Sequence, residues 1–184
     1  MHLRGALYID GASITRKLQE RGRATGVSYK LEYGKLARWV ERSTQAEMVV
    51  RKYYTARWSD GPESRGFFYQ HLEQRGFTVV EMVSKEFSKY VETQDKQIVE
   101  HKIHADKGVD VAIALDSYID MTTERYHLDV LVLATHDGDF VPLVQRLAKK
   151  KIYVVGFSDR MSLELRKSAT PLFLDEADPG VMKS

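Results

Sequence analysis

The stretch from Asp129 to Pro142, DVLVLATHDGDFVP, constrains the fold of this chain more than any other. Five apolar residues, 130–134, precede a run of turn-forming residues, which predicts a short buried strand. The following segment has apolar residues at helical spacing, with Asp139 at the expected N-cap position and Pro142 in the first turn. A strand therefore passes directly into a helix, and Asp137 and Asp139 lie at the junction. In open parallel sheets, ligands bind at this edge.

The start of the chain repeats this arrangement. Residues 5–10 predict a first strand that ends at Asp10-Gly11, and residues 12–21 predict a helix. Turn chemistry alone explains an Asp-Gly pair at either place. Two such junctions on strands that could be neighbours favour a functional edge, where Asp10 and Asp137 would face one crevice.

Strands and helices alternate along the rest of the chain. Further strands are predicted at 47–56, 77–83 and 152–157, and further helices at 31–41, 64–75, 107–126, 139–150 and 162–167. Residues 84–97 fit either an extended loop or an extra hairpin, and residues 171–184 an irregular tail with an edge strand left open at 172–174. This alternation predicts one α/β domain over residues 1–184, with a central parallel sheet of about five strands and helices on both faces.

Composition excludes several classes of function. The chain has 184 residues, 43% of them hydrophobic, which is enough for one domain with a full core. It has no cysteine, which excludes disulfides, zinc-thiolate sites and cysteine nucleophiles. Neither a signal peptide nor an apolar run long enough to span a membrane is visible, so a cytoplasmic location without a membrane partner is expected. The net charge of +2 means that nucleic-acid binding would have to come from local patches.

A third carboxylate, Asp110, lies in an apolar helical segment that leads into the strand before Asp137. A carboxylate in such surroundings is rarely left without a partner, because burying a lone charge is costly. Asp116 is six positions further on, about 120° around the helix, so it is the more doubtful site residue. Clustered carboxylates repel one another unless a cation joins them, and a hard divalent ion such as Mg²⁺ or Mn²⁺ is the simplest partner.

Three blocks of this sequence resemble the signature blocks of the NYN domain family, the branch of PIN-like nucleases that includes the LabA and DUF88 proteins. The blocks are YIDG at 8–11, KGVDV at 107–111 and THDGDFVPL at 135–143, and the resemblance covers essentially the whole chain. It implies a PIN-like Rossmannoid three-layer sandwich with strand order 3-2-1-4-5 and metal-dependent cleavage of RNA. It also implies that Asp10, Asp110 and Asp137 are catalytic, metal-binding acids, with Asp139 in support.

One residue departs from the family pattern. The first block of the family usually reads Asp-Gly-x-Asn, and here Ser13 stands in the Asn position. A serine is shorter and reaches less far toward a substrate phosphate. Ser13, Lys107 and Thr135 are the candidate substrate-binding residues. The competing interpretations are a solvated charged face for Lys107 and simple strand termination for Thr135.

Two other groups of residues were weighed as binding sites. The segments RKYY at 51–54 and RW at 57–58 interleave basic and aromatic residues, which suits stacking on bases. Alternate residues of a strand must face the core, however, so packing explains about half of them. His101 and His104 are spaced to share one face of a helix, but the sequence shows no third ligand, so a zinc site is not expected.

The sequence thus predicts a Mg²⁺- or Mn²⁺-dependent ribonuclease that acts on single-stranded or structured RNA. The alternative is a non-catalytic RNA- or protein-binding module that keeps the fold. This interpretation is based on Ser13, which stands where the family usually has Asn. A phosphatase is less favoured, because Asp10 is followed by Gly11-Ala12 and not by a second Asp two residues on. The sequence leaves open whether the protein forms a homo-oligomer.

Overall fold

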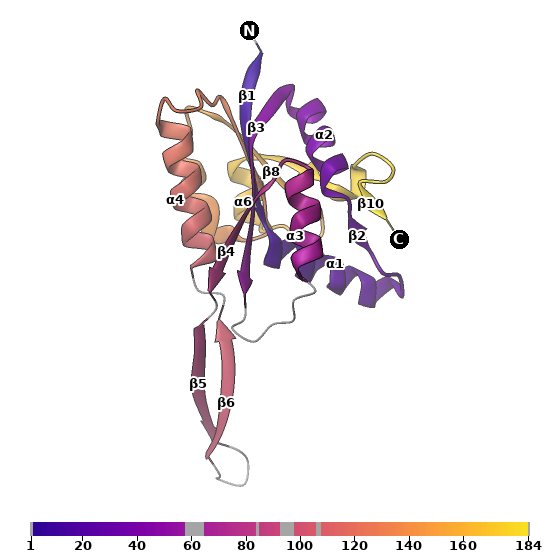
Figure 1. Ribbon diagram of the computed structural model, residues 1–184, viewed down its shortest axis with the longest axis vertical. Coiled ribbons are helices and arrows are strands. Elements are labelled where there is room, and N and C mark those ends of the chain that lie inside the picture. The colour runs from indigo at the N-terminus through magenta and orange to yellow at the C-terminus, as the bar shows by residue number, and fades with distance from the viewer. Residues whose placement is uncertain (1, 58–64, 84, 93–97, 106–107, 184) are drawn as a thin grey trace.

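A six-stranded parallel sheet forms the centre of the protein (Figure 1). The computed structural model describes residues 2–57, 65–83, 85–92, 98–105 and 108–183. The strand order is β4-β3-β1-β7-β8-β9, and every neighbouring pair in this sheet is parallel. The strands are β1 (Leu3–Asp10), β3 (Ala46–Arg57), β4 (Thr78–Val83), β7 (Val130–Ala134), β8 (Lys151–Gly156) and β9 (Thr170–Phe173). The expected order of five strands is confirmed, and β9 adds a sixth strand at one edge.

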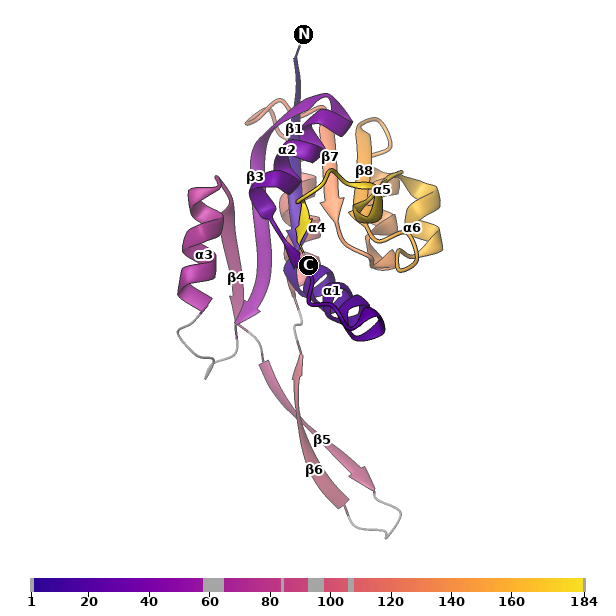
Figure 2. The ribbon, with the colours of Figure 1, turned by 90° about the vertical axis from the view of Figure 1, so that its right-hand side faces the viewer.

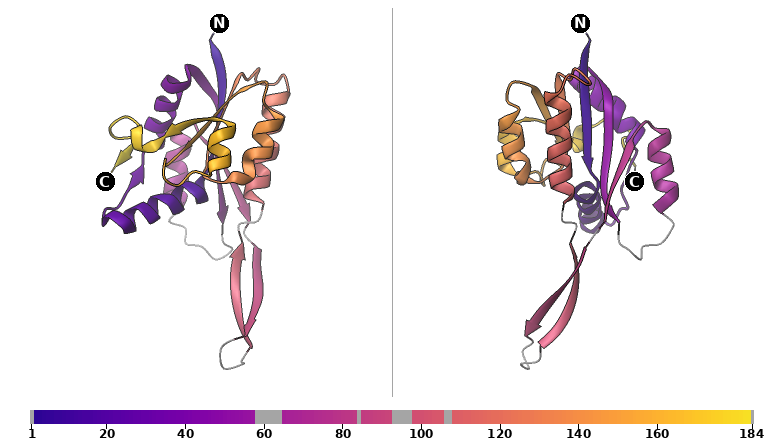
Figure 3. Two further views of the ribbon diagram at one scale, coloured as in Figure 1. Left: turned by 180° about the vertical axis from the view of Figure 1, so that it is seen from behind. Right: turned by 60° about the vertical axis from the view of Figure 1, so that its left-hand side comes forward.

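Helices cover both faces of this sheet, which confirms the three-layer arrangement (Figures 2 and 3). One face carries α1 (Gly11–Thr25), α2 (Tyr33–Thr44) and α3 (Arg65–Gln74). The other carries α4 (Val109–Thr122), α5 (Val141–Arg146) and α6 (Leu163–Ser168). Helix α3 ends before Gly76, whose positive φ of 79° fits the C′ glycine that the sequence predicted.

The central strands are buried on both sides. In β1, Leu7 and Ile9 belong to the cluster under α1 and α2, whereas Ala6 and Tyr8 belong to the cluster under α4. All five residues of β7 are buried. Apolar runs without polar alternation are typical of parallel strands between two helical layers. The carboxyl ends of β1 and β7 therefore lie side by side at one edge, with Ile9 paired to Ala134.

A two-stranded antiparallel hairpin extends away from the body at this edge (Figures 1 and 3). It consists of β5 (Lys85–Glu92) and β6 (Ile98–Ala105) and connects β4 to α4. Of the residues 84–97 for which the sequence left a loop or a hairpin open, 85–92 form a hairpin strand, and the others lie outside the described residues. His101 and His104 lie on a strand and not on a helix, so their helical spacing has no structural meaning.

Two local predictions are corrected. The helix expected over 139–150 is shorter: a 3₁₀ turn, η1 (Gly138–Phe140), precedes α5. The C-terminal segment expected to be irregular contains the end of β9, the turn η2 (Leu174–Glu176) and β10 (Met182–Lys183), which pairs antiparallel with β2 (Lys30–Leu31). In the described part of the chain, no helix is long and apolar enough to cross a membrane.

Candidate active site

Asp10 is the most rigidly held of the predicted acids. It is the last residue of β1 and the N-cap of α1, and only 6% of it is exposed. Its Oδ1 accepts a hydrogen bond of 2.9 Å from the backbone N–H of Ser13, and its Oδ2 accepts one of 3.2 Å from the hydroxyl of Thr135. Burial raises the pKa of the Asp10 carboxyl, and the two hydrogen bonds counteract this in part.

Asp137 lies at the end of the neighbouring strand and caps the turn η1. Its Oδ1 accepts a hydrogen bond of 2.9 Å from the backbone N–H of Asp139. The N-cap is therefore Asp137, not Asp139 as the sequence predicted, because η1 starts one residue earlier than the expected helix. Thr135 joins the two strand ends: its hydroxyl donates to Asp10 and accepts from the backbone N–H of Asp137 at 3.3 Å.

Thr135 and Ser13, two of the predicted substrate-binding residues, are each 2% exposed. The hydroxyls of both are engaged within the protein, so their contacts here are with the site and not with solvent. Lys107, the third, lies outside the described residues.

Asp110 approaches the same edge from the first turn of α4 and is exposed. Partial desolvation, together with the negative charges of Asp10, Asp137 and Asp139, raises the pKa of its carboxyl to about 6. Asp139 is exposed on η1. Asp110 therefore lies within the electrostatic reach of the other three carboxylates, although it comes from a different element.

No positive charge in the described part of the chain forms an ion pair with any of these four carboxylates. Within the described residues, no three Asp, Glu or His side chains are arranged to hold a metal ion on their own. Mg²⁺ commonly takes only one or two carboxylates and fills its shell with water and substrate phosphates. Carboxylate oxygens are hard donors that suit such a cation, so the residues present fit a divalent metal.

His136 was not singled out in the sequence, yet it ties three elements together beside Asp137. Its Nε2 accepts a 2.9 Å hydrogen bond from the backbone N–H of Phe157, so the neutral ring carries its proton on Nδ1. Nδ1 lies 3.2 Å from the hydroxyl of Ser13 and donates to it. Burial, with the charges of Lys17 and Arg16, lowers the pKa of His136 to about 4. The residue in the Asn position of the family is thus bound to a neutral histidine.

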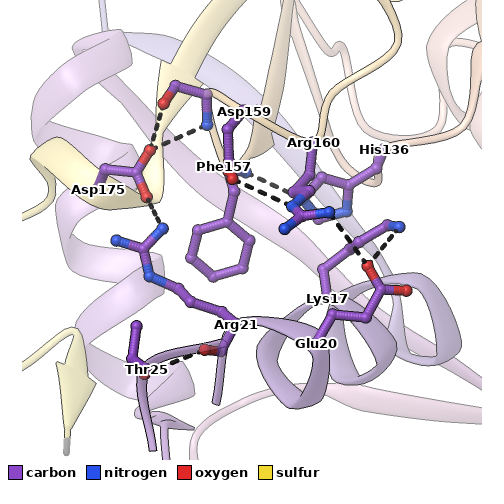
Figure 4. Close-up of polar contacts among 10 residues, drawn as sticks. Lys17, Glu20, Arg21, Thr25, His136, Phe157, Asp159, Arg160 and Asp175 are labelled. Carbon is purple, nitrogen blue, oxygen red and sulfur yellow. Dashed lines mark hydrogen bonds and ion pairs between the residues drawn. The ribbon is translucent and has the colours of Figure 1, made fainter. Parts of the chain in front are cut away.

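The loop after β8, against which His136 packs, is fastened to α1 (Figure 4). The guanidinium of Arg21 lies over the ring of Phe157 at 5.3 Å from its centroid and forms a 3.1 Å ion pair with Asp175. The residue before Arg21 in α1, Glu20, lies 3.9 Å from the guanidinium of Arg160. These contacts hold the strand end that supports His136, and hence the Thr135–Asp137 segment.

Asp116, the doubtful site residue, belongs to a different cluster in the middle of α4. Its Oδ2 accepts hydrogen bonds from the Lys52 ammonium at 3.1 Å and the Tyr54 hydroxyl at 2.6 Å. Lys52 also donates to Asp120 at 2.9 Å, and Tyr8 donates to the same oxygen of Asp120 at 2.6 Å. This α4 clamp (Tyr8, Lys52, Tyr54, Asp116 and Asp120) joins the helix to β1 and β3. The sequence showed Asp116 and Asp120 one turn apart, but nothing in it indicated their partners.

Comparison with known proteins gives two matches. The model of the NYN domain family matches residues 4–176. A crystal structure of a protein of unknown function from Vibrio parahaemolyticus is similar, with a TM-score of 0.65 and 25% sequence identity over 94% of this chain and 93% of that chain. No curated protein sequence matches. The family match is to NYN domains as a whole, and the LabA and DUF88 branch stays a prediction.

Proposed function

Because this chain belongs to the NYN domain family, a family of PIN-like nucleases that typically use divalent metals, we propose that it is a Mg²⁺- or Mn²⁺-dependent ribonuclease. The proposed catalytic residues are Asp10, Asp110, Asp137 and Asp139, and the first three would hold the metal. The substrate would be RNA, single-stranded or structured.

One observation carries the proposal: carboxylates from β1, α4 and the β7 end lie at the carboxyl edge of the sheet, and none of them forms an ion pair with a cation that the structure describes. Partial desolvation is the largest cause of the raised pKa of Asp110, and the negative charges of Asp10, Asp137 and Asp139 add to it. A cluster that served only to stabilise the fold would be expected to contain its own counter-charge. The uncompensated charge therefore supports an external cation as part of the working site.

Each residue has a distinct part in this proposal. Asp10 is fixed by two hydrogen bonds and is the immobile ligand, whereas Asp110 is exposed and can turn toward an arriving ion. Thr135 sets the spacing of the two strand ends, because its single hydroxyl contacts both. A divalent cation would supply charge neutralisation at the phosphodiester and a more acidic water for attack.

The decisive experiment compares two substitutions on one helix. Asp110→Asn removes a ligand charge and is expected to lower the rate of cleavage of single-stranded RNA in Mn²⁺ by at least about 100-fold, the range seen when a group that stabilises transition-state charge is lost. Asp116→Asn makes the same chemical change at the α4 clamp and should keep the rate within about threefold of wild type.

Circular dichroism of both variants shows whether the fold survives, and EDTA should abolish cleavage by the wild type. Equal loss in both variants, or cleavage that persists in EDTA, would contradict the proposed site.

The alternative, a non-catalytic RNA- or protein-binding module, is supported by the hydrogen bonds of Ser13. Its hydroxyl accepts hydrogen bonds from the ring and the backbone of His136, so it faces that histidine. A module of this kind would bind RNA in Mn²⁺ without cleaving it, and Asp110→Asn would leave that binding intact. The same assay therefore separates the two functions.

A further inference from the structure

A cavity opens beside the proposed acids, on the opposite face of the sheet from Asp110. Its volume is about 420 Å³, within the usual range for small-ligand sites. It lies between α1, α3 and the end of β3, and the residues that matter for its chemistry are Gly11, Arg16, Gln19, Tyr53, Phe68 and Tyr69. Gly11 follows Asp10 directly, so the cavity and the acidic edge share the same strand end.

Two larger cavities, of about 820 and 800 Å³, lie elsewhere. The first is lined by residues at the start of β1 and β3, such as Leu3 and Ala46, at the opposite edge of the sheet from the acids. The second lies beside β8 and the end of α6, with Tyr153 and Lys167 in its wall. Neither is lined by any of the four proposed acids or by a residue next to one in sequence.

The floor of the smaller cavity depends on a glycine. A Cβ atom at position 11 would lie 2.3 Å from the ring and hydroxyl of Tyr53 and 2.7 Å from the carbonyl oxygen of Tyr54. Only glycine therefore allows α1 to start this close to β3. The result is that the ring of Tyr53 packs directly against the buried Gly11 where the cavity meets Asp10.

Aromatic rings form the wall opposite α1. The ring of Phe68 makes edge contacts with Tyr33 and Tyr53, at centroid distances of 5.7 and 5.6 Å, and a tilted contact with Tyr69 at 5.9 Å. Three such contacts fix the orientation of the ring, yet Phe68 remains 37% exposed. A ring held in place from behind and open in front is suited to stacking on another π-system.

Arg16 supplies a positive charge between the cavity and the acids. It is exposed and lines the cavity, and its charge lowers the pKa of both Asp10 and Asp110. It forms no ion pair with another residue that the structure describes. A guanidinium in this position is suited to a phosphate that approaches the acidic edge.

We propose that this cavity binds one unpaired base of an RNA strand, stacked on Phe68, while Arg16 contacts the phosphate that leads to Asp10. The exposed amide of Gln19 lies at the cavity rim and can hydrogen-bond the edge of that base. A duplex cannot present a base in this way, because its bases are stacked and paired. The proposal rests on the proposed function and refines its substrate to single-stranded or looped RNA.

The test measures binding apart from cleavage. Fluorescence anisotropy of a labelled ten-nucleotide oligoadenylate is recorded in Mg²⁺ with Asp110→Asn protein as the parent, in which the proposed reaction is blocked. Phe68→Leu in this parent keeps an apolar side chain but loses the stacking ring, and we expect about tenfold weaker binding. Phe67→Leu is the matched control: Phe67 is the adjacent residue, 81% exposed and outside the cavity, and the change should cost less than twofold.

Competition with inorganic polyphosphate separates base from phosphate contacts. Phe68→Leu should leave polyphosphate binding unchanged, which also shows that the variant is folded. Arg16→Ala should weaken the binding of both oligoadenylate and polyphosphate. Gln19→Ala, at an exposed position that cannot disturb the core, should weaken the binding of oligoadenylate about threefold. This variant provides the test if Phe68→Leu does not fold.

Unchanged oligoadenylate affinity in Gln19→Ala and in any folded Phe68→Leu would overturn the proposal. So would equal losses at positions 67 and 68, or tighter binding of duplex RNA than of the single strand. Loss of binding in Phe68→Leu, with no cleavage by the wild type, would support the cavity and reject the nuclease. Normal cleavage by the wild type, together with RNA binding that does not depend on Phe68 or Gln19, would support the nuclease and reject the cavity.

Discussion

Helix α4 contributes aspartates to two clusters that differ in how their charge is balanced. In the α4 clamp, Asp116 and Asp120 share the ammonium of Lys52, and each also accepts a hydrogen bond of 2.6 Å from a tyrosine. At the carboxyl edge of the sheet, Asp110 lies within the electrostatic reach of three more carboxylates, and among the described residues none of the four forms an ion pair. The clamp contains its own cation, whereas the edge cluster (Asp10, Asp110, Asp137 and Asp139) forms no ion pair with any cation among the described residues.

This difference teaches how to separate structural acids from site acids. Burial alone does not do so, because Asp120 in the clamp and Asp10 at the edge are each 6% exposed. The partners of the two carboxylates do differ: the clamp uses the partly exposed ammonium of Lys52, and Asp10 uses only a backbone N–H and a hydroxyl. A carboxylate whose hydrogen bonds hold it in place without neutralising it remains available to a cation.

The largest effect on stability is expected from breaking the clamp. Lys52→Met leaves two aspartates without a counter-charge, one of them almost fully buried, and should lower the free energy of unfolding by about 2–4 kcal/mol. The melting temperature should fall by roughly 5–15 °C. Lys17→Met, which removes a partly exposed ion pair with Glu20, is the control and should leave the melting temperature almost unchanged. Thermal melts of both variants decide this, and similar shifts would show that the clamp contributes little.

The response to metal should be the next largest effect and should be confined to the edge cluster. Millimolar Mn²⁺ is expected to stabilise the wild type by about 1–2 kcal/mol, or roughly 3–6 °C, because it binds the native state. Asp137→Asn should melt at a higher temperature than wild type in EDTA and show no Mn²⁺ shift, whereas Asp116→Asn should respond like wild type. If Asp137→Asn keeps the full shift, Mn²⁺ binds elsewhere and the comparison between the two clusters fails.

The smallest effect concerns pH. The pKa of Asp110 is about 6 in the folded protein and near 3.9 in an unfolded chain, so the folded state holds its proton more tightly. This contribution to stability is complete below about pH 4 and is lost as the pH rises through 6. Because Asp110 is exposed, the change should be below about 1 kcal/mol.

The melting temperature of wild type minus that of Asp110→Asn, measured in EDTA, should therefore fall by roughly 2–3 °C between pH 4 and pH 7. A difference that stays constant, or rises, would mean that the neighbouring carboxylates do not act on Asp110.

The sequence by itself determined the layers of the fold and the proposed acids of the edge cluster. Apolar runs and Asp-Gly turns depend on near neighbours in the chain, so Asp10 and Asp137 could be placed at strand ends before any contact was known. The residues alone left the adjacency of those strands open, and only the strand order implied by the family resemblance made them neighbours. The family resemblance, confirmed by the match over residues 4–176, pointed to the same edge. The roles of these residues stay a proposal.

Only the tertiary structure decided which acids are neutralised. Lys52 is 64 and 68 residues from the aspartates it pairs with, and Ser13 is 123 residues from His136, so no local pattern reports either contact. The same holds for β10, a two-residue strand that exists because β2 is beside it. Even the N-cap moved from Asp139 to Asp137, because a 3₁₀ turn fits between strand and helix where periodicity predicted a single helix. Periodicity records which face of an element is buried, but the charge balance of a side chain depends on groups that only folding brings within hydrogen-bond distance.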